Sequence, residues 1–289
     1  MFNASQHQYL VPFDGSFSIA QADTTPPEDP DKKQYKKKHR KYIADLDDLQ
    51  RRLYAQDQYS LLLIFQAMDA AGKDSTIRAV MRGINPAGCQ VFSFKQPSKE
   101  ELDHDFLWRT TRCLPERGRI GIFNRSYYEE VLVVRVHPEF LAAQRLPYSP
   151  QLADLWPQRF ASIREHEEHL ARNGTIILKF WLNVSKQEQR ERFLSRLEEP
   201  EKNWKFSAKD VAERAHWDDY MHTYEQALNE TSRPWAPWYA IPADHKLYMR
   251  LEVAEILVSA LESLDLHYPR LDTEQHANIQ ALRANLSRE

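Results

Sequence analysis

A short apolar strand followed by a glycine turn and a helix constrains this chain more than any other segment. Residues 60–65 read Ser-Leu-Leu-Leu-Ile-Phe, a continuous apolar run of strand length. Such a run is typical of a parallel strand that is buried on both faces of its sheet. The turn at 67–73 reads Ala-Met-Asp-Ala-Ala-Gly-Lys, and a helix is predicted from there to about Arg82. The segment therefore predicts an α/β fold.

This turn has the placement of a phosphate-binding loop (P-loop). In such a loop, backbone N–H groups, a lysine ammonium and a helix N-terminus face the phosphates. The match is incomplete, because Ala67 replaces the usual first glycine and Asp74 replaces the usual serine or threonine. An ordinary turn with an exposed lysine is the alternative. The position between strand and helix favours phosphate binding, and the candidate residues are Asp69, Ala70, Ala71, Gly72, Lys73, Asp74 and Ser75.

Asp69 is an unusual residue inside an anion-binding loop. Phosphate would repel its carboxylate unless a metal ion bridges the two. The residue therefore predicts Mg²⁺ between Asp69 and the phosphates. The alternative is a carboxylate that hydrogen-bonds to the backbone of its own turn.

Strands and helices alternate along the remaining chain. Further strands are predicted at 90–94, 119–123, 175–184 and 238–241, and the main helices at 31–58, 126–136, up to 172, 185–197, 207–229 and 245–264, with a short terminal one. This alternation predicts a five-stranded parallel sheet with helices on both faces. Residues 1–30 are expected to form an irregular arm, and residues 31–289 a single domain.

A second group of polar residues follows the predicted strand at 119–123. Ligands of open parallel sheets bind at the carboxyl ends of the strands. P-loop enzymes usually place a metal-holding aspartate here, whereas this chain has Asn124. Arg125 is suited to bidentate phosphate contact. Glu129 and Glu130 have two readings, a metal or ribose role or the ordinary acidic start of a helix.

Four segments together resemble the polyphosphate kinase 2 family. They are 67–74 (Ala-Met-Asp-Ala-Ala-Gly-Lys-Asp), 123–132 (Phe-Asn-Arg-Ser-Tyr-Tyr-Glu-Glu-Val-Leu), 204–206 (Trp-Lys-Phe) and 236–246 (Ala-Pro-Trp-Tyr-Ala-Ile-Pro-Ala-Asp-His-Lys). The resemblance runs from about Lys32 to Leu264. It implies a P-loop kinase fold similar to thymidylate kinase and reversible, Mg²⁺-dependent phosphate transfer between inorganic polyphosphate and nucleotides.

The resemblance also implies roles for individual residues. Asp69 and Lys73 would be the catalytic pair, and Arg125 would act with them. The form of the second motif resembles the subgroup that accepts nucleoside mono- and diphosphates, which makes AMP and ADP the leading acceptors and leaves guanine nucleotides open. Asn124, where many members have aspartate, departs from the pattern. The family likeness suggests a homodimer or homotetramer.

The likeness to kinases also places an acceptor region and a lid. Asn85 and Lys95 would lie near the acceptor nucleotide, although a solvated lysine in a proline-containing turn is the alternative reading. Residues 186–214 would form a helical lid that supplies cations to the transferring phosphate. The candidate phosphate contacts there are Arg192, Lys205 and Arg214. The same segment also fits solvated helix faces with i,i+4 ion pairs.

Charge is concentrated at one place. The chain has a formal net charge of −3, which does not suggest nucleic-acid binding. Residues 32–41 nevertheless contain seven Lys/Arg, and this cluster favours contact with a polyanion over a merely solvated helix face. No long apolar run predicts a membrane span. Two cysteines in different predicted elements indicate reduced thiols in a cytoplasmic protein.

The sequence therefore predicts a polyphosphate-dependent nucleotide phosphotransferase that makes ADP and ATP from AMP and ADP. An ATP-dependent nucleoside monophosphate kinase is one alternative, because a fold does not fix the phosphate donor. A non-catalytic module that binds polyphosphate or nucleotide is the other, given Ala67, Asp74 and Asn124.

Overall fold

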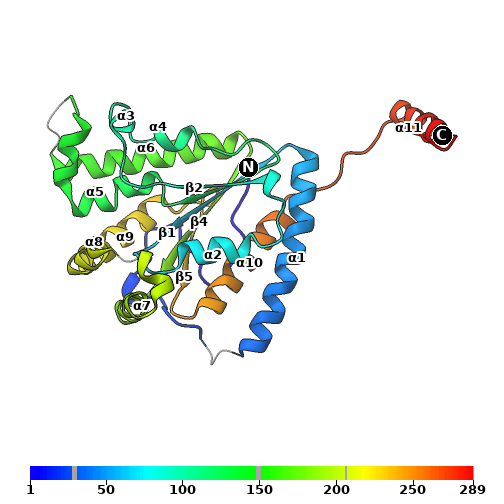
Figure 1. The fold of residues 1–289 in the computed structure, drawn as a ribbon. Coiled ribbons are helices and arrows are strands. Elements are labelled where there is room, and N and C mark those ends of the chain that lie inside the picture. Colours follow the sequence, from blue (N-terminus) through cyan, green and yellow to red (C-terminus); the bar gives the residue numbers. More distant parts are fainter. Residues whose placement is uncertain (28–30, 148–150, 206, 289) are drawn as a thin grey trace.

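A five-stranded parallel sheet forms the centre of the computed structural model (Figure 1). The structure describes residues 1–27, 31–147, 151–205 and 207–288. The strand order is β2-β3-β1-β4-β5, which places the strand before the phosphate loop in the middle. All five predicted strands are confirmed: β1 (Ser60–Gln66), β2 (Cys89–Ser93), β3 (Ile120–Asn124), β4 (Thr175–Asn183) and β5 (Trp238–Pro242).

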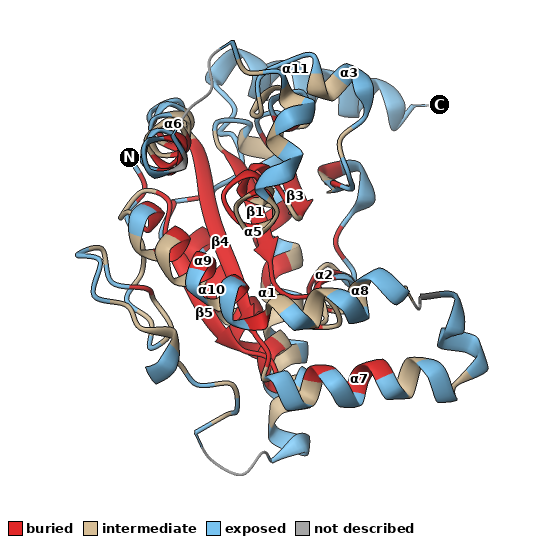
Figure 2. Ribbon diagram, turned by 90° about the vertical axis from the view of Figure 1, so that its left-hand side faces the viewer, coloured by how far each residue is buried: buried red, intermediate tan, exposed pale blue. Residues whose placement is uncertain are grey.

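Helices cover both faces of the sheet. On one face α1 and α2 pack against α10, and on the other α6 packs on β4 together with α9 (Figure 1). Every residue of β1, β3, β4 and β5 is buried, as Figure 2 shows for the sheet. The long helices are α1 (Lys32–Gln56), α2 (Lys73–Val80), α6 (Leu152–Arg172), α7 (Lys186–Glu198), α9 (Trp217–Thr231) and α10 (Lys246–Glu262).

Short helices connect these elements. They are α3 (Lys99–Leu102), α4 (Trp108–Thr111), α5 (Val133–Val136) and α8 (Ala208–Ala212), with 3₁₀ helices η1 (Ile19–Gln21), η2 (Pro86–Gly88), η3 (Tyr127–Glu130), η4 (Pro138–Gln144), η5 (Pro200–Lys205) and η6 (Glu213–His216). Ser98 and Glu101 form a capping box at the start of α3. Of the described helices, none is long and apolar enough to cross a bilayer.

Two predicted helices are wrong in their extent. The helix expected at 126–136 is η3 followed by a single turn, α5, because Arg125 adopts a left-handed backbone (φ 64°) and the following valines are β-branched. The helix expected at 207–229 is divided into α8, η6 and α9. At the division, Glu213 accepts hydrogen bonds from outside its own turn, from His137 and Tyr220.

A buried ion pair holds η3 on the sheet. Lys179 on β4 and Glu167 on α6 lie 2.5 Å apart, and both side chains are fully buried. Tyr127 and Tyr128 of η3 donate hydrogen bonds to Glu167 at 2.9 and 2.8 Å. Lys179 also donates to the Thr231 carbonyl. Burial lowers the pKa of Lys179 to about 8, although Glu167 opposes this shift. The group is satisfied by hydrogen bonds, as a buried pair must be to persist.

Replacing Lys179 with Met should lower the free energy of unfolding by about 3–5 kcal/mol, because Glu167 would stay buried without its cation. Urea denaturation at pH 7 measures this. The double variant Lys179→Met/Glu167→Gln should recover much of the loss, since it is neutral and keeps an acceptor for the tyrosines. A single variant as stable as the wild type would contradict this account.

The described part of the N-terminal arm, residues 1–27, contains the short η1 and is tied to the domain. The Val11 amide donates to the Trp238 carbonyl, and the Ala240 amide donates to the Tyr9 carbonyl. The arm therefore lies along the free edge of β5. Gln8 also reaches Glu252 of α10 at 3.4 Å, where burial, followed by the charge of Glu255, raises the Glu252 pKa to about 7.

Burial of the Glu252 carboxyl should make the protein less stable as pH rises. The unfolded chain releases the Glu252 proton near pH 4.5, whereas the folded protein keeps it to about pH 7. The contribution of this group to stability is thus complete below pH 4.5 and lost as pH rises through 7. Glu252→Gln, which stays neutral, should raise Tm by a few degrees at pH 8 and change little at pH 5. Glu262→Gln, an exposed control on α10, should behave as the wild type; equal responses of both variants would refute the assignment.

The terminal helix α11 (Thr273–Leu286) stands apart from the body (Figure 1). It follows an extended segment, and none of its residues is buried. Compact packing therefore ends near Leu266, and the domain predicted to reach 289 carries its last helix outside the packed core.

Candidate active site

The predicted phosphate loop lies at the carboxyl end of β1 and leads directly into α2. Gly72 has φ 111°, a backbone conformation that favours glycine, and the turn could not close in the same way with a bulkier residue there. Ala70 is also left-handed, at φ 61°. These two left-handed residues give the loop a tightly wound backbone, and turns that contain such residues are the type that forms anion-binding concavities.

Lys73 is buried and folds back over the loop. Its ammonium donates to the Ala67 carbonyl at 2.6 Å and to the Met68 carbonyl at 3.3 Å. Burial, assisted by the charge of Arg125, lowers the pKa of Lys73, while Asp69 opposes the shift. The lysine is therefore held inside the loop by intrachain bonds that a phosphate oxygen could replace.

Asp69 and Arg125 join the phosphate loop to the end of β3. The Arg125 guanidinium lies 2.6 Å from Oδ1 of Asp69 and 3.5 Å from Glu129. Burial would raise the pKa of Asp69, but the charges of Lys73 and Arg125 outweigh it and lower that pKa. The charge of Glu129, followed by that of Asp69, raises the pKa of Arg125. The carboxylate and the guanidinium are thus both charged at neutral pH.

A hydrogen bond between Asn124 and Asp74 also joins the end of β3 to the start of α2. The Asn124 amide donates to Asp74 at 2.6 Å, and Gln66 at the end of β1 donates to Glu129 at 2.9 Å. Ser75 is bonded to the Gly72 carbonyl. The structure therefore brings the two predicted motifs together at the carboxyl edge of β1 and β3.

Arg192 has a different place from the one predicted. Its guanidinium donates to the carbonyls of Ala70, Ala71, Ala243 and Asp244, and its Nε donates to Glu188. An arginine has five N–H donors, so all of them are directed at the chain itself. In this structure Arg192 fastens the phosphate loop to the loop after β5 rather than presenting a free cation to phosphate.

The other predicted contacts are more peripheral. Arg214 donates to the Lys186 carbonyl and to Gln189, which in turn donates to the Asp69 carbonyl. Asn85 is exposed and caps η2. Lys95 is exposed just beyond β2. Lys205 closes η5, and its side chain lies outside the described residues.

A cleft of about 990 Å³ extends from the phosphate loop between α2, α7 and α10. Besides Asp69 and Lys73, cations from all three helices and from η5 line it: Arg78, Arg192, Arg196, Lys202, Lys246 and Arg250. The cations of this cleft that sequence reasoning did not select as site residues are Arg78, Arg196, Lys202, Lys246 and Arg250. A signal existed, because Lys246 and Arg250 lie at i,i+4 on the helix after β5 and so share one face.

Trp204 in η5 is 78% exposed and lines this cleft, whereas Trp217 and Trp238 are buried in the core.

The fold and this site define a phosphotransferase of the P-loop kinase type. The sequence profile of the family described as Polyphosphate kinase 2 (PPK2) matches residues 29–269. The chain belongs to this family, as the sequence resemblance implied, and it is a polyphosphate-dependent nucleotide phosphotransferase.

Named relatives agree with this assignment. The chain is 56% identical over 256 residues to an ADP-polyphosphate phosphotransferase of Rhodopseudomonas palustris, covering 88% of this chain and 89% of that protein. It is 48% identical over 228 residues to an AMP/ADP-polyphosphate phosphotransferase of Meiothermus ruber, covering 79% and 81%. The crystal structure of polyphosphate kinase 2 from Arthrobacter aurescens TC1 superposes with a TM-score of 0.85 at 37% identity, covering 98% and 99%.

Arg192→Met should lower stability as well as activity. Four backbone carbonyls would lose a charged hydrogen-bond donor. A buried acceptor that is left unsatisfied costs about 1–3 kcal/mol. Thermal unfolding and kcat should both fall. Lys202→Met, a cation of the same cleft that is 46% exposed, should change KM for the polyanion without changing Tm. If Arg192→Met left Tm unchanged and raised only KM, the structural role would be contradicted and a direct contact between Arg192 and phosphate would be supported.

Proposed function

We propose that this chain transfers a phosphoryl group from inorganic polyphosphate to both AMP and ADP. The observation that carries the proposal is the row of cations that begins at the phosphate loop and continues along α2 and α10. Burial and the neighbouring charges of Arg78 and Arg192 lower the pKa of Arg250. Like charges held this close indicate a surface shaped for an extended polyanion, which would relieve their repulsion.

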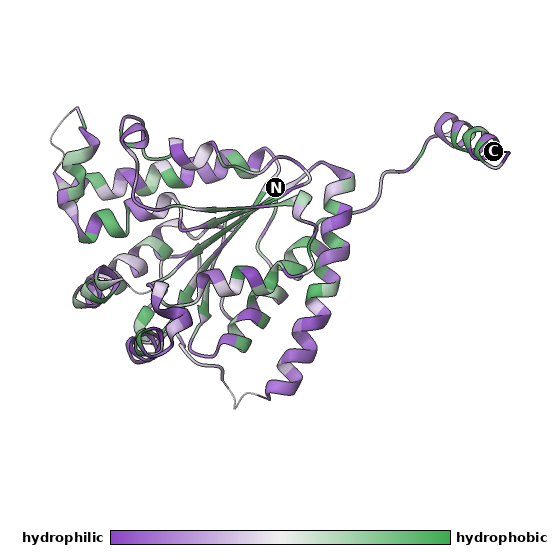
Figure 3. Ribbon diagram, viewed as in Figure 1, coloured by the Kyte–Doolittle hydropathy of each residue, from purple (hydrophilic) through white to green (hydrophobic). Residues whose placement is uncertain are grey.

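The basic start of α1 prolongs this row. Figure 3 shows the first half of α1 as a hydrophilic segment. Tyr35 of α1 lies against His245 and Tyr248 at the start of α10, so the cluster at 32–41 lies next to Lys246 and Arg250. A chain of phosphates leaving the cleft would meet these lysines. This length of positive surface favours polyphosphate over ATP as the donor.

The loop residues fit Mg²⁺. Mg²⁺ is usually bound by one or two carboxylates together with substrate phosphates and water. Asp69 offers a half-buried carboxylate whose Oδ1 is paired with Arg125, and among the described residues Oδ2 accepts no hydrogen bond. Asp74 is exposed on the other side of Gly72. When bound, the ion would neutralise negative charge on the phosphates.

The protein's own residues would position the substrates and stabilise the charge on the transferring phosphoryl group. Lys73 would exchange the Ala67 and Met68 carbonyls for phosphate oxygens. Arg125 would hold Asp69 and contact the transferring group, with Glu129 orienting it. The lid cations, Lys205 and Arg214 among them, would cover the reacting phosphates. In-line transfer needs no covalent intermediate under these conditions.

The dual acceptor rests on two supports. The Meiothermus ruber relative is named for both AMP and ADP. The second support is the motif that contains Asn124, whose form resembles the subgroup that accepts nucleoside mono- and diphosphates. In the structure the neutral Asn124 amide donates a hydrogen bond to Asp74. Asn85 and Lys95 lie exposed beyond α2 and β2, where they are available to an acceptor phosphate.

The test supplies long-chain polyphosphate, Mg²⁺ and either AMP or ADP, without ATP, and follows nucleotides by chromatography. ADP should give ATP, and AMP should give ADP and ATP. Lys73→Met should lower kcat/KM by at least about 10³-fold, because the loss of a charge that stabilises the transition state has effects of that order. Lys99→Met, which removes an exposed lysine on α3 away from the cleft, is the matched control and should retain most activity.

The outcomes separate the alternatives. ATP from ADP alone would keep polyphosphate as donor and refute the dual acceptor. Transfer from ATP to a nucleoside monophosphate, with none from polyphosphate, would favour an ATP-dependent kinase. Binding of polyphosphate without any turnover would favour a non-catalytic module.

A further inference from the structure

Helix α7 lies beside the phosphate loop and holds it through two side chains on one face. Gln189 and Arg192 are three residues apart on α7, so they lie on the same side of the helix. Gln189 is 1% exposed, and its amide nitrogen donates to the Asp69 carbonyl at 2.9 Å. Arg192 donates to the carbonyls of Ala70 and Ala71 at 3.1 and 2.6 Å. Three consecutive loop carbonyls therefore face α7.

The direction of these carbonyls determines where the loop amides point. In a planar trans peptide, the carbonyl of one residue and the N–H of the next point in opposite directions. Because the Asp69 and Ala71 carbonyls face α7, the N–H groups of Ala70 and Gly72 point away from the side chains that hold the loop. Among the described residues these two N–H groups have no acceptor, whereas the Ala71 N–H closes the turn on the Met68 carbonyl. Two amides of the loop are therefore available to an anion.

The chemistry of its two partners fixes the orientation of the Gln189 side chain. An arginine can only donate hydrogen bonds, and a backbone carbonyl can only accept them. Arg214 of η6 donates to Oε1 of Gln189, so the amide NH₂ has to face the Asp69 carbonyl. Arg214 is itself held by the Lys186 carbonyl at the start of α7. The Gln189 amide therefore has one orientation, and the segment expected to form the lid sets it.

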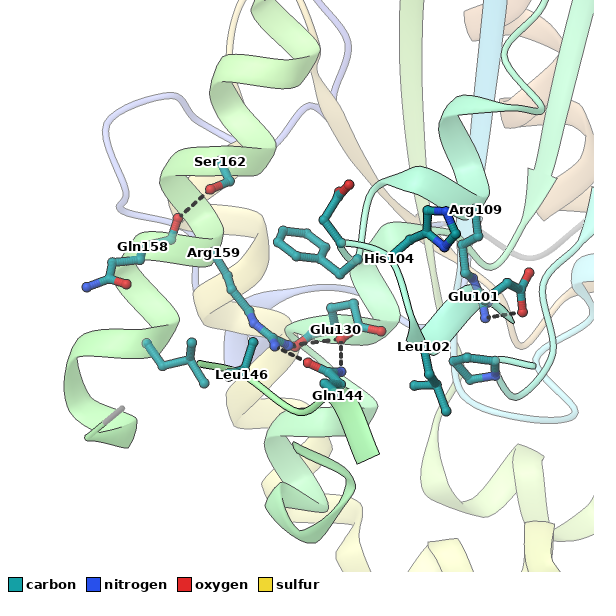
Figure 4. A pocket seen from close by; sticks show the side chains of 14 residues that line it. Glu101, Leu102, His104, Arg109, Glu130, Gln144, Leu146, Gln158, Arg159 and Ser162 are labelled. Atoms are coloured by element: carbon teal, nitrogen blue, oxygen red, sulfur yellow. Dashed lines mark hydrogen bonds and ion pairs between the residues drawn. The ribbon is translucent and has the colours of Figure 1, made fainter. Parts of the chain in front are cut away.

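The carboxylate of Asp69 is fixed independently of its carbonyl. Its Oδ1 is paired with Arg125, which also lies 3.5 Å from Glu129 of η3. The next residue of η3, Glu130, accepts a hydrogen bond from Arg159 of α6 at 2.9 Å, and Figure 4 shows this pair. Because η3 is anchored to α6 in this way, the arginine beside the carboxylate has a fixed partner. The side chain of the aspartate is thus held from η3, and its main chain is held from α7.

We propose that Gln189 is a positioning residue of the phosphotransferase site, and that its hydrogen bond to the Asp69 carbonyl holds the N–H groups of Ala70 and Gly72 toward the substrate phosphate. The inference rests on the proposed function for the role of the loop in phosphate binding. It adds a residue that contacts no substrate and acts through the peptide planes of the loop. Arg214 fixes the Gln189 amide, so this one side chain connects the lid to the loop.

The first experiment observes a loop amide by NMR. Protein labelled with ¹³C at the alanine carbonyl and ¹⁵N at glycine gives a coupled signal only where glycine follows alanine, which occurs at Ala71–Gly72 and Ala87–Gly88. Ala87 is exposed, so the background variant Ala87→Ser leaves the Gly72 signal alone. Saturating tripolyphosphate should move this signal downfield, because the Gly72 N–H would gain a charged acceptor.

In the same background, Gln189→Met keeps the length of the side chain but removes the amide. The Gly72 signal should then move much less, and the Kd of tripolyphosphate, measured by calorimetry, should rise by about tenfold. Gln187→Met is the matched control, because Gln187 is exposed on α7 and bonds only to Glu191 of its own helix. It should give the shift and the Kd of the background protein.

The second experiment separates positioning from a loss of folded enzyme. Gln189→Met should raise KM for polyphosphate and lower kcat, with kcat/KM reduced by at least about tenfold, and leave KM for ADP unchanged. A smaller amount of folded enzyme lowers the apparent kcat alone and changes neither KM. Arg214→Met, at a partly exposed position, keeps the test usable if Gln189→Met does not fold, and it should also reduce the Gly72 shift.

The contrary outcomes are distinct. A full Gly72 shift and an unchanged KM for polyphosphate in Gln189→Met would overturn the inference, and a full shift in Arg214→Met would overturn the connection to the lid. If tripolyphosphate did not move the Gly72 signal of the background protein, the inference would also fall. Turnover of ADP by polyphosphate in that protein would still leave the proposed function standing, so the two failures are distinguishable.

Discussion

The buried pair of Lys179 and Glu167 is the interaction on which the arrangement of the site depends. It ties β4, α6, the end of α9 and η3 into one unit. A buried pair gains little net stability over apolar packing, but it allows only one geometry for its partners. That geometry fixes the tyrosines of η3, and η3 carries Glu129 toward Arg125 and Glu130 toward Arg159 of α6. A hydrophobic contact would hold the turn without fixing its rotation.

In the active site, some charged side chains hold the protein backbone in place, whereas others line the cleft where a substrate can contact them. Arg192 uses its donors on the backbone of the phosphate loop, whereas the cations of α2 and α10 line the cleft. Arg125 is intermediate, since it bridges two carboxylates and lies a third exposed. Such fixed charges act without reorganisation when the phosphate charge moves, which is the main source of electrostatic catalysis.

The sequence was sufficient for the sheet and for the phosphate loop, because apolar strand runs and a Gly72 turn are local signals. It also placed Asp69, Lys73, Asn124 and Arg125 at one edge, since parallel strands end together. It did not reveal the roles that depend on distant partners. Arg192 reads as a lid cation until the carbonyls after β5 are seen beside it. The hydrogen bonds from Tyr127 and Tyr128 to Glu167 of α6, which hold the short helix after Ser126, are likewise invisible in the local sequence.

The inward fold of Lys73 has a consequence for how tightly substrate can be held. In this structure the loop already satisfies its own ammonium, so binding of a phosphate would exchange hydrogen-bond partners rather than capture a bare charge. The loop backbone is already wound through left-handed residues at Ala70 and Gly72, so little of it would need to be ordered on binding, which lowers the entropic cost of association.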